Sequence, residues 1–241
     1  QGYNLDVPEN LWKDGEAAKF TGYAELVYRA NLLGQDPTVT NWKGGNISGK
    51  YVETDFDGAP VRVLRIKGSG SDLRTATRED FAGVRHDPVL KLLARIEMSD
   101  EDMVAYLAHC LTDIPSKRPS IETLMHSFMP FEHIDHTHSD GSLWYASMED
   151  GRRRAEDVLQ EGLVWVDYHR PGFHLARTVG EAVKKNPKAR CVILAKHGLS
   201  IDGVETYDVY YAWDTASVFQ TIQDGVKGRP VSPRATAALD R

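Results

Sequence analysis

The hydrophobic pattern of the chain predicts helices in five stretches. In each one, apolar residues recur at spacings of three and four positions, the period of a helix with one buried face. In the stretch 120–129, Ser120 stands where a helix N-cap belongs. The apolar stripe of that stretch consists of Ile121, Leu124, Met125 and Phe128. The predicted helices span residues 17–33, 100–111, 120–129, 178–186 and 204–222, and a short helix begins at 77–80.

Short apolar runs between these helices predict strands. The sequence V-R-V-L-R-I at 61–66 is one example, and the continuous run C-V-I-L-A at 191–195 is another. The predicted strands span residues 61–66, 133–138, 163–166 and 191–195, and glycine-rich turns are predicted at 42–49 and 67–72. Because strands and helices alternate along the chain, the pattern indicates a layered α/β or α+β domain.

The composition is that of a globular domain and limits the partners. Of 241 residues, 41% are hydrophobic and 27% charged, close to the averages for such domains. The formal net charge of −6 argues against a general nucleic-acid binder. No apolar run of about 18 residues predicts a membrane span, and no apolar segment near the start predicts a signal peptide. The two cysteines, Cys110 and Cys191, lie far apart, which fits a reducing compartment and a cytoplasmic protein.

The end of the chain differs from the rest in composition. Residues 224–241 contain two prolines, two glycines and few apolar side chains, which is typical of a linker or tail. We therefore predict one domain over residues 1–223, followed by a tail or linker over 224–241.

Three histidines stand in contexts that suit a metal site. His136 and His138 alternate along a predicted strand, so their side chains project from the same face. His197 follows the predicted strand 191–195, at a strand end where α/β proteins place functional groups. Three such ligands leave a fourth position open for catalysis, and imidazole suits zinc, with iron or cobalt as alternatives. The opposing interpretation is that the His-x-His pair is a structural feature of an exposed strand.

Glu122 is the candidate acid or base. It lies near the start of the predicted helix 120–129 and off its apolar stripe. That helix leads directly into the strand that carries the histidine pair, so a carboxylate here would lie near the metal and exchange a proton with substrate. The alternative is an acidic first-turn residue that complements the helix dipole.

Two polar glycine turns and a helix start predict an anion site. Backbone N–H groups of glycine turns converge on anions, and serine or asparagine side chains add donors. The first turn contains Asn46, the second contains Ser69 and Gly70 beside Lys67, and Ser120 adds a donor at a helix N-terminus. The alternative interpretation is that these segments are simple turns.

Taken together, these motifs resemble the class II aldolase/adducin family. The resemblance extends from about residue 25 to residue 220. It rests on G-G-N-I-S at 44–48, G-S-G at 68–70, S-I-E at 120–122, H-T-H at 136–138, Y-H-R-P-G at 168–172 and K-H-G at 196–198. The sequences R-P-S-I-E-T-L-M-H at 118–126 and V-D-Y-H-R-P-G-F at 166–173 resemble the aldolase domain of rhamnulose-1-phosphate aldolase/short-chain dehydrogenase fusion proteins.

The resemblance implies a three-layer α/β/α fold of the α/β class, with a central and largely antiparallel sheet. It implies a homotetramer whose active sites lie at subunit interfaces. The family's zinc ligands correspond to His136, His138 and His197, and its general acid/base corresponds to Glu122. The positions that hold the substrate phosphate correspond to Asn46, Ser69, Gly70 and Ser120. Ile121 stands where sugar-phosphate aldolases often have a second hydroxyl residue.

The implied activity is that of a zinc-dependent lyase acting on a small-molecule sugar phosphate in carbohydrate metabolism. It would cleave a ketose 1-phosphate, resembling the rhamnose-derived rhamnulose 1-phosphate, to dihydroxyacetone phosphate and a short aldehyde such as lactaldehyde. An epimerase, dehydratase or decarboxylase would need the same metal and acid/base, so these reactions are alternatives, as is an adducin-like scaffold without catalysis. No G-x-G-x-x-G fingerprint is present, so a dehydrogenase domain would have to lie elsewhere in a longer gene product.

Overall fold

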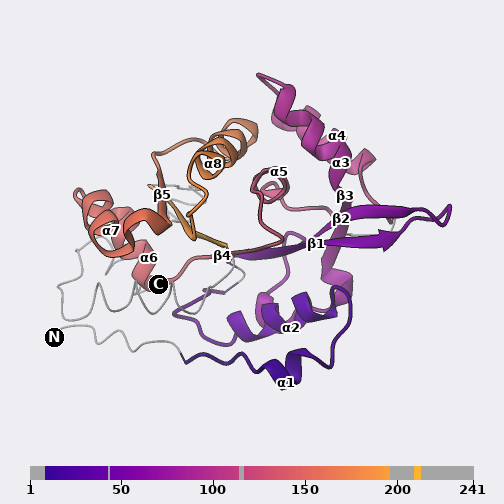
Figure 1. Ribbon diagram of the computed structural model, residues 1–241, viewed down its shortest axis with the longest axis horizontal. Coiled ribbons are helices and arrows are strands. Elements are labelled where there is room, and N and C mark those ends of the chain that lie inside the picture. The colour runs from indigo at the N-terminus through magenta and orange to yellow at the C-terminus, as the bar shows by residue number, and fades with distance from the viewer. Residues whose placement is uncertain (1–8, 43, 114–116, 196–208, 213–241) are drawn as a thin grey trace.

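The computed structural model describes residues 9–42, 44–113, 117–195 and 209–212, and their strands form one seven-stranded sheet (Figure 1). The strands are β1 (Asn46–Thr54), β2 (Pro60–Lys67), β3 (Phe81–Arg85), β4 (His133–Thr137), β5 (Leu163–Val166), β6 (Cys191–Leu194) and β7 (Val209–Ala212). Their order across the sheet is β3-β2-β1-β4-β7-β6-β5. Neighbouring strands run antiparallel except for the parallel pair β5 and β6, which confirms the predicted, largely antiparallel sheet.

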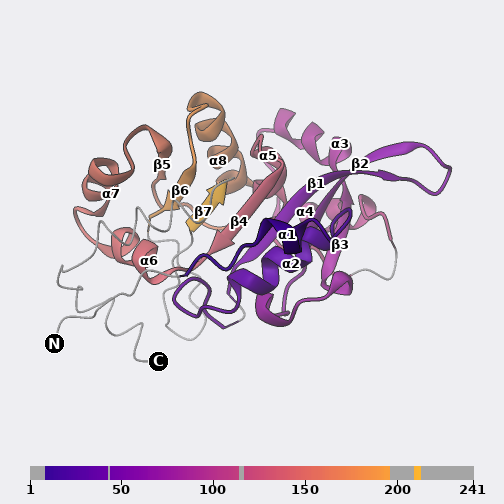
Figure 2. The same ribbon diagram turned by 60° about the horizontal axis from the view of Figure 1, so that its bottom comes forward.

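Helices cover both faces of this sheet. They are α1 (Asp14–Ala17), α2 (Ala24–Leu33), α3 (His86–Leu90), α4 (Asp100–His109), α5 (Thr123–Phe128), α6 (Asp140–Ser147), α7 (Gly151–Leu159) and α8 (Phe173–Lys185). Single 3-10 turns span Leu73–Thr75, Arg78–Asp80, Lys91–Ala94 and Gln160–Gly162. Helices α5 and α8 lie on one side of the sheet, and α2 lies on the other (Figures 1 and 2). The α/β/α layering is therefore as predicted.

Strand alternation divides the apolar core between the two faces. In β6, Val192 and Leu194 join the core that contains residues of α5 and α8, whereas Cys191 and Ile193 join a core with α6 and α7. Successive strand residues point to opposite faces, so a continuous apolar run is required where helices cover both sides. This explains why the apolar sequence at 191–195 predicted a buried strand correctly.

Several predicted elements have different bounds in the structure. The predicted helix 17–33 is interrupted, because the chain turns at Gly22, whose φ of +56° is outside the helical range, and α2 begins afterwards. The helix expected from 77–80 is a single 3-10 turn, Arg78–Asp80, that leads into β3. The predicted helix 178–186 begins earlier, as α8. In contrast, 61–66, 100–111, 133–138 and 163–166 form elements of the predicted type.

Two predictions were wrong because sheet pairing overrides the local pattern. The glycine-rich turn predicted over 42–49 ends early, and β1 begins at Asn46 because β2 and β4 pair with it on either side. A helix was predicted over 204–222, but within this stretch the structure has strand β7, which pairs with both β4 and β6. Valine and tyrosine suit a strand that fills such a gap. The remainder of 204–222 and the predicted tail 224–241 lie outside the described residues.

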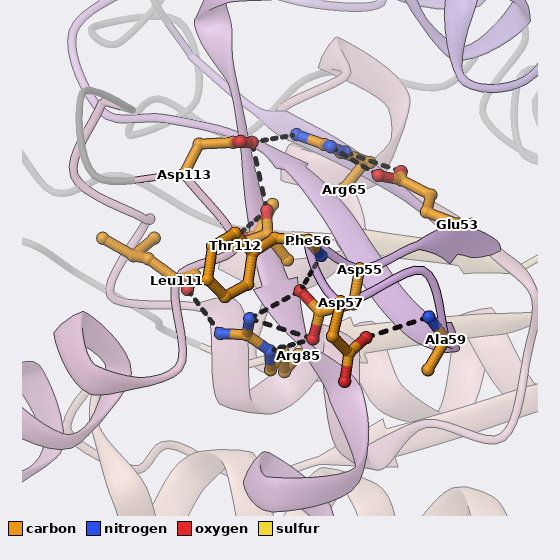
Figure 3. Close-up of polar contacts among 11 residues, drawn as sticks. Glu53, Asp55, Phe56, Asp57, Ala59, Arg65, Arg85, Leu111, Thr112 and Asp113 are labelled. Carbon is orange, nitrogen blue, oxygen red and sulfur yellow. Dashed lines mark hydrogen bonds and ion pairs between the residues drawn. The ribbon is translucent and has the colours of Figure 1, made fainter.

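The β1–β2 hairpin extends beyond the helices (Figures 1 and 2). Ion pairs within the hairpin and from β3 hold it in place (Figure 3). Arg85 of β3 donates to both carboxylate oxygens of Asp55 in the hairpin, at 2.8 Å and 3.1 Å from Nη2. Arg65 of β2 donates to Glu53 of β1 at 2.8 Å from Nε. These contacts hold the outer end of β1 and the hairpin turn, whereas the inner end of β1 carries the candidate site.

Candidate active site

Pairing of β1 with β4 places Asn46 directly opposite His136. Directly opposed residues on neighbouring strands point to the same face of a sheet. The preceding Gly45 has a φ of +69°, and a Cβ there would lie 2.5 Å from the carbonyl oxygen of His136. A Cβ at Gly44 would lie 3.2 Å from Nδ1 of His138. The two glycines therefore allow the loop before β1 to approach the histidine segment closely.

Glu122 completes a polar cluster with these strands. Its carboxylate accepts a hydrogen bond from Asn46 Nδ2, and its Oε1 lies 3.6 Å from Nε2 of His136. Asn46 Nδ2 also lies 3.2 Å from Ser120 Oγ. The side chains of Glu122 and His136 are 14% and 2% exposed. The structure thus brings together four predicted site residues from three separate stretches of chain.

The start of α5 differs from its prediction, and the difference places the carboxylate. The helix begins at Thr123, and its N-cap position is Glu122, two residues after the predicted N-cap Ser120. Ser120 Oγ instead accepts from the backbone N–H of Glu122 at 3.2 Å. Ser120 therefore orders the turn ahead of the helix, and the side chain of Glu122 leaves the helix end toward β4.

The two histidines of the pair bring one ring nitrogen each close to the other. Nε2 of His136 and Nε2 of His138 are 3.1 Å apart, and their rings are inclined at 72°. Two nitrogens bound to one tetrahedral zinc at 2.0–2.1 Å would lie about 3.3 Å apart, so the pair fits an ion of this kind. No group of three potential ligands is found in the described part of the chain. The third predicted ligand, His197, lies outside it.

The second predicted anion turn packs beside the segment that leads to Ser120. A Cβ at Gly68 would lie 3.1 Å from the carbonyl oxygen of Arg118. Ser69 and Gly70 are exposed at the tip of this turn. Lys67 is buried beneath it and donates from Nζ to the carbonyl oxygen of Ser71 at 2.6 Å. Burial lowers the pKa of Lys67, while Asp80 and Glu122 act in the opposite direction.

Three buried polar residues, Ser48, Lys50 and His126, lie behind this cluster, and the sequence analysis gave none of them a role in the site. Ser48 Oγ lies 2.8 Å from Nδ1 of His126, and Lys50 donates from Nζ to Phe131 O at 2.6 Å. Burial, followed by the nearby His136, lowers the pKa of His126 well below its ordinary value. The detectable signal was the alternation of Asn46, Ser48 and Lys50, which an expected turn concealed.

The buried Lys50 makes the free energy of unfolding depend on pH. Its side chain is surrounded by protein, and burial lowers its pKa from 10.5 to about 8. Below pH 8 both the folded and unfolded states carry the charge, and the folded state bears the full cost of burying it. Between pH 8 and 10.5 the unfolded state binds more protons, so the free energy of unfolding rises with pH.

We expect the difference in unfolding free energy between the wild type and Lys50→Met to change in favour of the wild type as pH rises. The full change across the interval from pH 7 to above 10.5 is about 3 kcal/mol. Urea denaturation of both proteins at a series of pH values measures it, and the other titrating groups cancel in the difference. A difference that stays constant with pH would contradict the burial of a charged amine.

No helix in the described residues is both long and apolar enough to cross a bilayer. One curated protein is similar in sequence to nearly the whole chain. YuxG of Bacillus subtilis (strain 168), named an uncharacterized oxidoreductase, is 44% identical over 222 residues. The match covers 92% of this chain and 32% of YuxG, so the chain spans about a third of the length of this relative.

Two solved structures share the fold of this chain. The N-terminal class II aldolase domain of a conserved protein from Thermoplasma acidophilum has a TM-score of 0.76 at 29% identity, with coverage of 96% of this chain and 99% of that one. An L-fuculose 1-phosphate aldolase shares the fold, with a TM-score of 0.50, 16% identity and coverage of 90% and 94%. Residues 24–217 match the family described as the class II aldolase and adducin N-terminal domain. The chain therefore belongs to the class II aldolase and adducin family.

Proposed function

We propose that the chain is a zinc-dependent class II aldolase domain that reversibly cleaves a ketose 1-phosphate. The substrate resembles rhamnulose 1-phosphate, and the products are dihydroxyacetone phosphate and a short aldehyde such as lactaldehyde. The observation that carries this proposal is the position of the Glu122 carboxylate, 3.6 Å from Nε2 of His136 and hydrogen-bonded to Asn46. A potential acid/base and a potential metal ligand therefore lie close together, and both side chains are largely buried.

In this proposal Glu122 moves the proton at the substrate carbon next to the carbonyl. A positioned carboxylate can remove that proton in one direction of the reaction and return it in the other. Asn46 holds one carboxylate oxygen, which leaves the other directed toward His136. This reaction needs no lysine nucleophile. Lys67 instead donates a hydrogen bond to the carbonyl oxygen of Ser71 and orders the turn that contains Ser69 and Gly70.

We propose that His136 and His138, together with His197, hold a divalent ion, with zinc as the first candidate. When bound, such an ion supplies Lewis-acid polarisation of the substrate's oxygen atoms. For the phosphate group we propose Asn46, Ser69, Gly70 and Ser120 as binding positions. The contact between Asn46 and Ser120 at 3.2 Å and the exposure of Ser69 and Gly70 support this assignment.

We also propose what surrounds this domain in the natural protein and in the cell. A relative named as an oxidoreductase is about three times as long as the matched part, so we propose that the natural protein also carries a dehydrogenase domain. We further propose a cytoplasmic homotetramer, since the two cysteines are described as free thiols and the family resemblance implies this assembly.

Incubation of the zinc-loaded protein with a panel of ketose 1-phosphates and unphosphorylated ketoses tests the reaction and the phosphate requirement together. Triose products are expected from a phosphorylated substrate. An epimer, a dehydrated sugar or carbon dioxide would identify one of the alternative reactions of the same site. A protein that binds no metal and converts no member of the panel would instead favour the scaffold.

The metal assignment predicts a loss that can be measured without any substrate. Replacing a residue that only hydrogen-bonds to a metal ligand commonly weakens metal binding by about 10- to 100-fold. Loss of a ligand itself costs more, so His136→Ala should weaken zinc binding by at least about 100-fold. Isothermal titration of metal-stripped protein with zinc measures the effect. His109→Ala, at the end of α4, is the matched control and should bind zinc like the wild type. Equal binding by His136→Ala would remove His136 from the site.

A further inference from the structure

Three alternate residues of β1 form a polar row buried against α5. Asn46, Ser48 and Lys50 are 6%, 1% and 7% exposed. The residue between the first two, Ile47, points to the opposite face and joins the apolar core that contains Leu26 of α2. One face of β1 is thus apolar in the usual way, while the equally buried face toward α5 is polar.

Going along β1, each residue of this row contacts a residue further along the segment 120–131. Asn46 contacts Ser120 and Glu122 before the helix. Ser48 contacts His126 one turn later, and Lys50 donates to the carbonyl oxygens of Met129 and Phe131 beyond the helix end. The contacts advance in the same direction along both segments.

The periods of the two elements explain why the contacts stay in step. Two residues of a strand advance by about 6.7 Å, and four residues of a helix advance by about 6 Å. The hydrogen bond from His126 N to Glu122 O, at 3.1 Å, shows that these two residues are separated by one helical turn. The spacing from Asn46 to Ser48 along β1 therefore matches the one helical turn from the N-cap residue Glu122 to His126.

Polar contacts of this kind define a position that apolar packing leaves open. Apolar burial is non-directional, so an apolar surface would tolerate small shifts of α5 along β1. Hydrogen bonds in a buried setting are directional and costly to leave unmade. On the other side of α5, a Cβ at Gly180 of α8 would lie 2.8 Å from Cβ of Phe128, so α8 also approaches closely.

We infer that Ser48, His126 and Lys50 are positioning residues that fix α5 along β1 and thereby place the Glu122 carboxylate beside His136. The inference rests on the proposed function in so far as Glu122 is the acid/base. The direct contact of Asn46 with Glu122 sets the carboxylate locally, and the other two members of the row set the helix that carries it.

The Ser48–His126 contact provides the sharpest test, because matched variants are available. Ser48→Ala and His126→Leu remove the hydrogen bond, whereas His126→Asn keeps a polar atom near the place of Nδ1. Misplacement of a catalytic group by about 1 Å can lower rates by about 100-fold. We therefore expect kcat to fall by about 10- to 100-fold in the first two variants with KM changed by less than about twofold, and His126→Asn to recover most of the loss.

Ile193→Val is the control for a general loss of stability, since Ile193 is buried in the core with α6 and α7. It should leave kcat unchanged. Hydrogen exchange of the amides of 123–128 provides a readout that does not depend on activity, and should be about tenfold faster in Ser48→Ala than in Ile193→Val.

The outcomes separate the two proposals. If Ser48→Ala exchanges no faster over 123–128 than Ile193→Val, the positioning role is wrong, whatever the enzyme does. If the exchange is faster but the wild type converts no substrate, the positioning of α5 stands and the proposed function fails. If exchange is faster and kcat is unchanged in an active enzyme, α5 does not place the carboxylate and the inference is overturned.

Discussion

Glu122→Gln should lower the turnover of the proposed aldolase reaction by about 10²- to 10⁴-fold, the usual contribution of a positioned acid or base. Glutamine has nearly the same shape and its amide oxygen can still accept the hydrogen bond from Asn46 Nδ2. The change therefore removes proton transfer and leaves the packing in place. Steady-state kinetics on the best substrate of the ketose panel measures the loss, and metal analysis should show unchanged zinc content.

The matched control is Glu156→Gln, the same chemical change on an exposed residue of α7 that pairs with Arg152. Its turnover should remain within about twofold of the wild type, since exposed pairs of this kind contribute little. Full activity in Glu122→Gln would remove Glu122 from the mechanism. A parallel loss of zinc would show that the carboxylate acts on the metal and not on a proton.

The sequence predicted several elements from one local pattern, but it did not predict α3, α6 or α7. The apolar runs of β5 and β6 and the periodic stripe of α4 lie in the structure close to their predicted bounds. It failed at β1 and β7, whose strand conformation depends on pairing with two neighbours. Partners distant in sequence cannot be read from local periodicity, and tertiary contacts override weak local preferences.

The same distinction applies to the site. Glu122, His136 and Asn46 were predicted from residue type and motif, and the structure brings their side chains together. Ser48 and Lys50 were missed because β1 was not predicted as a strand, so the alternation that puts them on one face with Asn46 was not recognised. Here that face is covered by α5, and only the three-dimensional arrangement shows which helix covers it.

The strand that carries His136 is also held from its other face. Asp135 precedes His136 in β4 and therefore points to the side of α2. Arg29 of α2 donates from Nε to Oδ1 of Asp135 at 2.9 Å, and from Nη2 to the carbonyl oxygen of Ser48 at 3.1 Å. The two charged side chains are 14% and 7% exposed. One guanidinium thus joins α2 to both β4 and β1, directly behind the candidate site.

Because this ion pair is buried, removing one partner should be far more costly than removing both. Arg29→Met should lower the free energy of unfolding by about 3–5 kcal/mol, since it leaves the Asp135 carboxylate buried without its arginine. The double variant Arg29→Met/Asp135→Leu should recover most of that loss. Urea denaturation of both single variants and the double variant completes the cycle. The control Arg152→Met breaks an exposed ion pair with Glu156 and should lower the free energy of unfolding by less than about 1 kcal/mol. An equally small loss in Arg29→Met would show that the Arg29–Asp135 pair does not anchor β4.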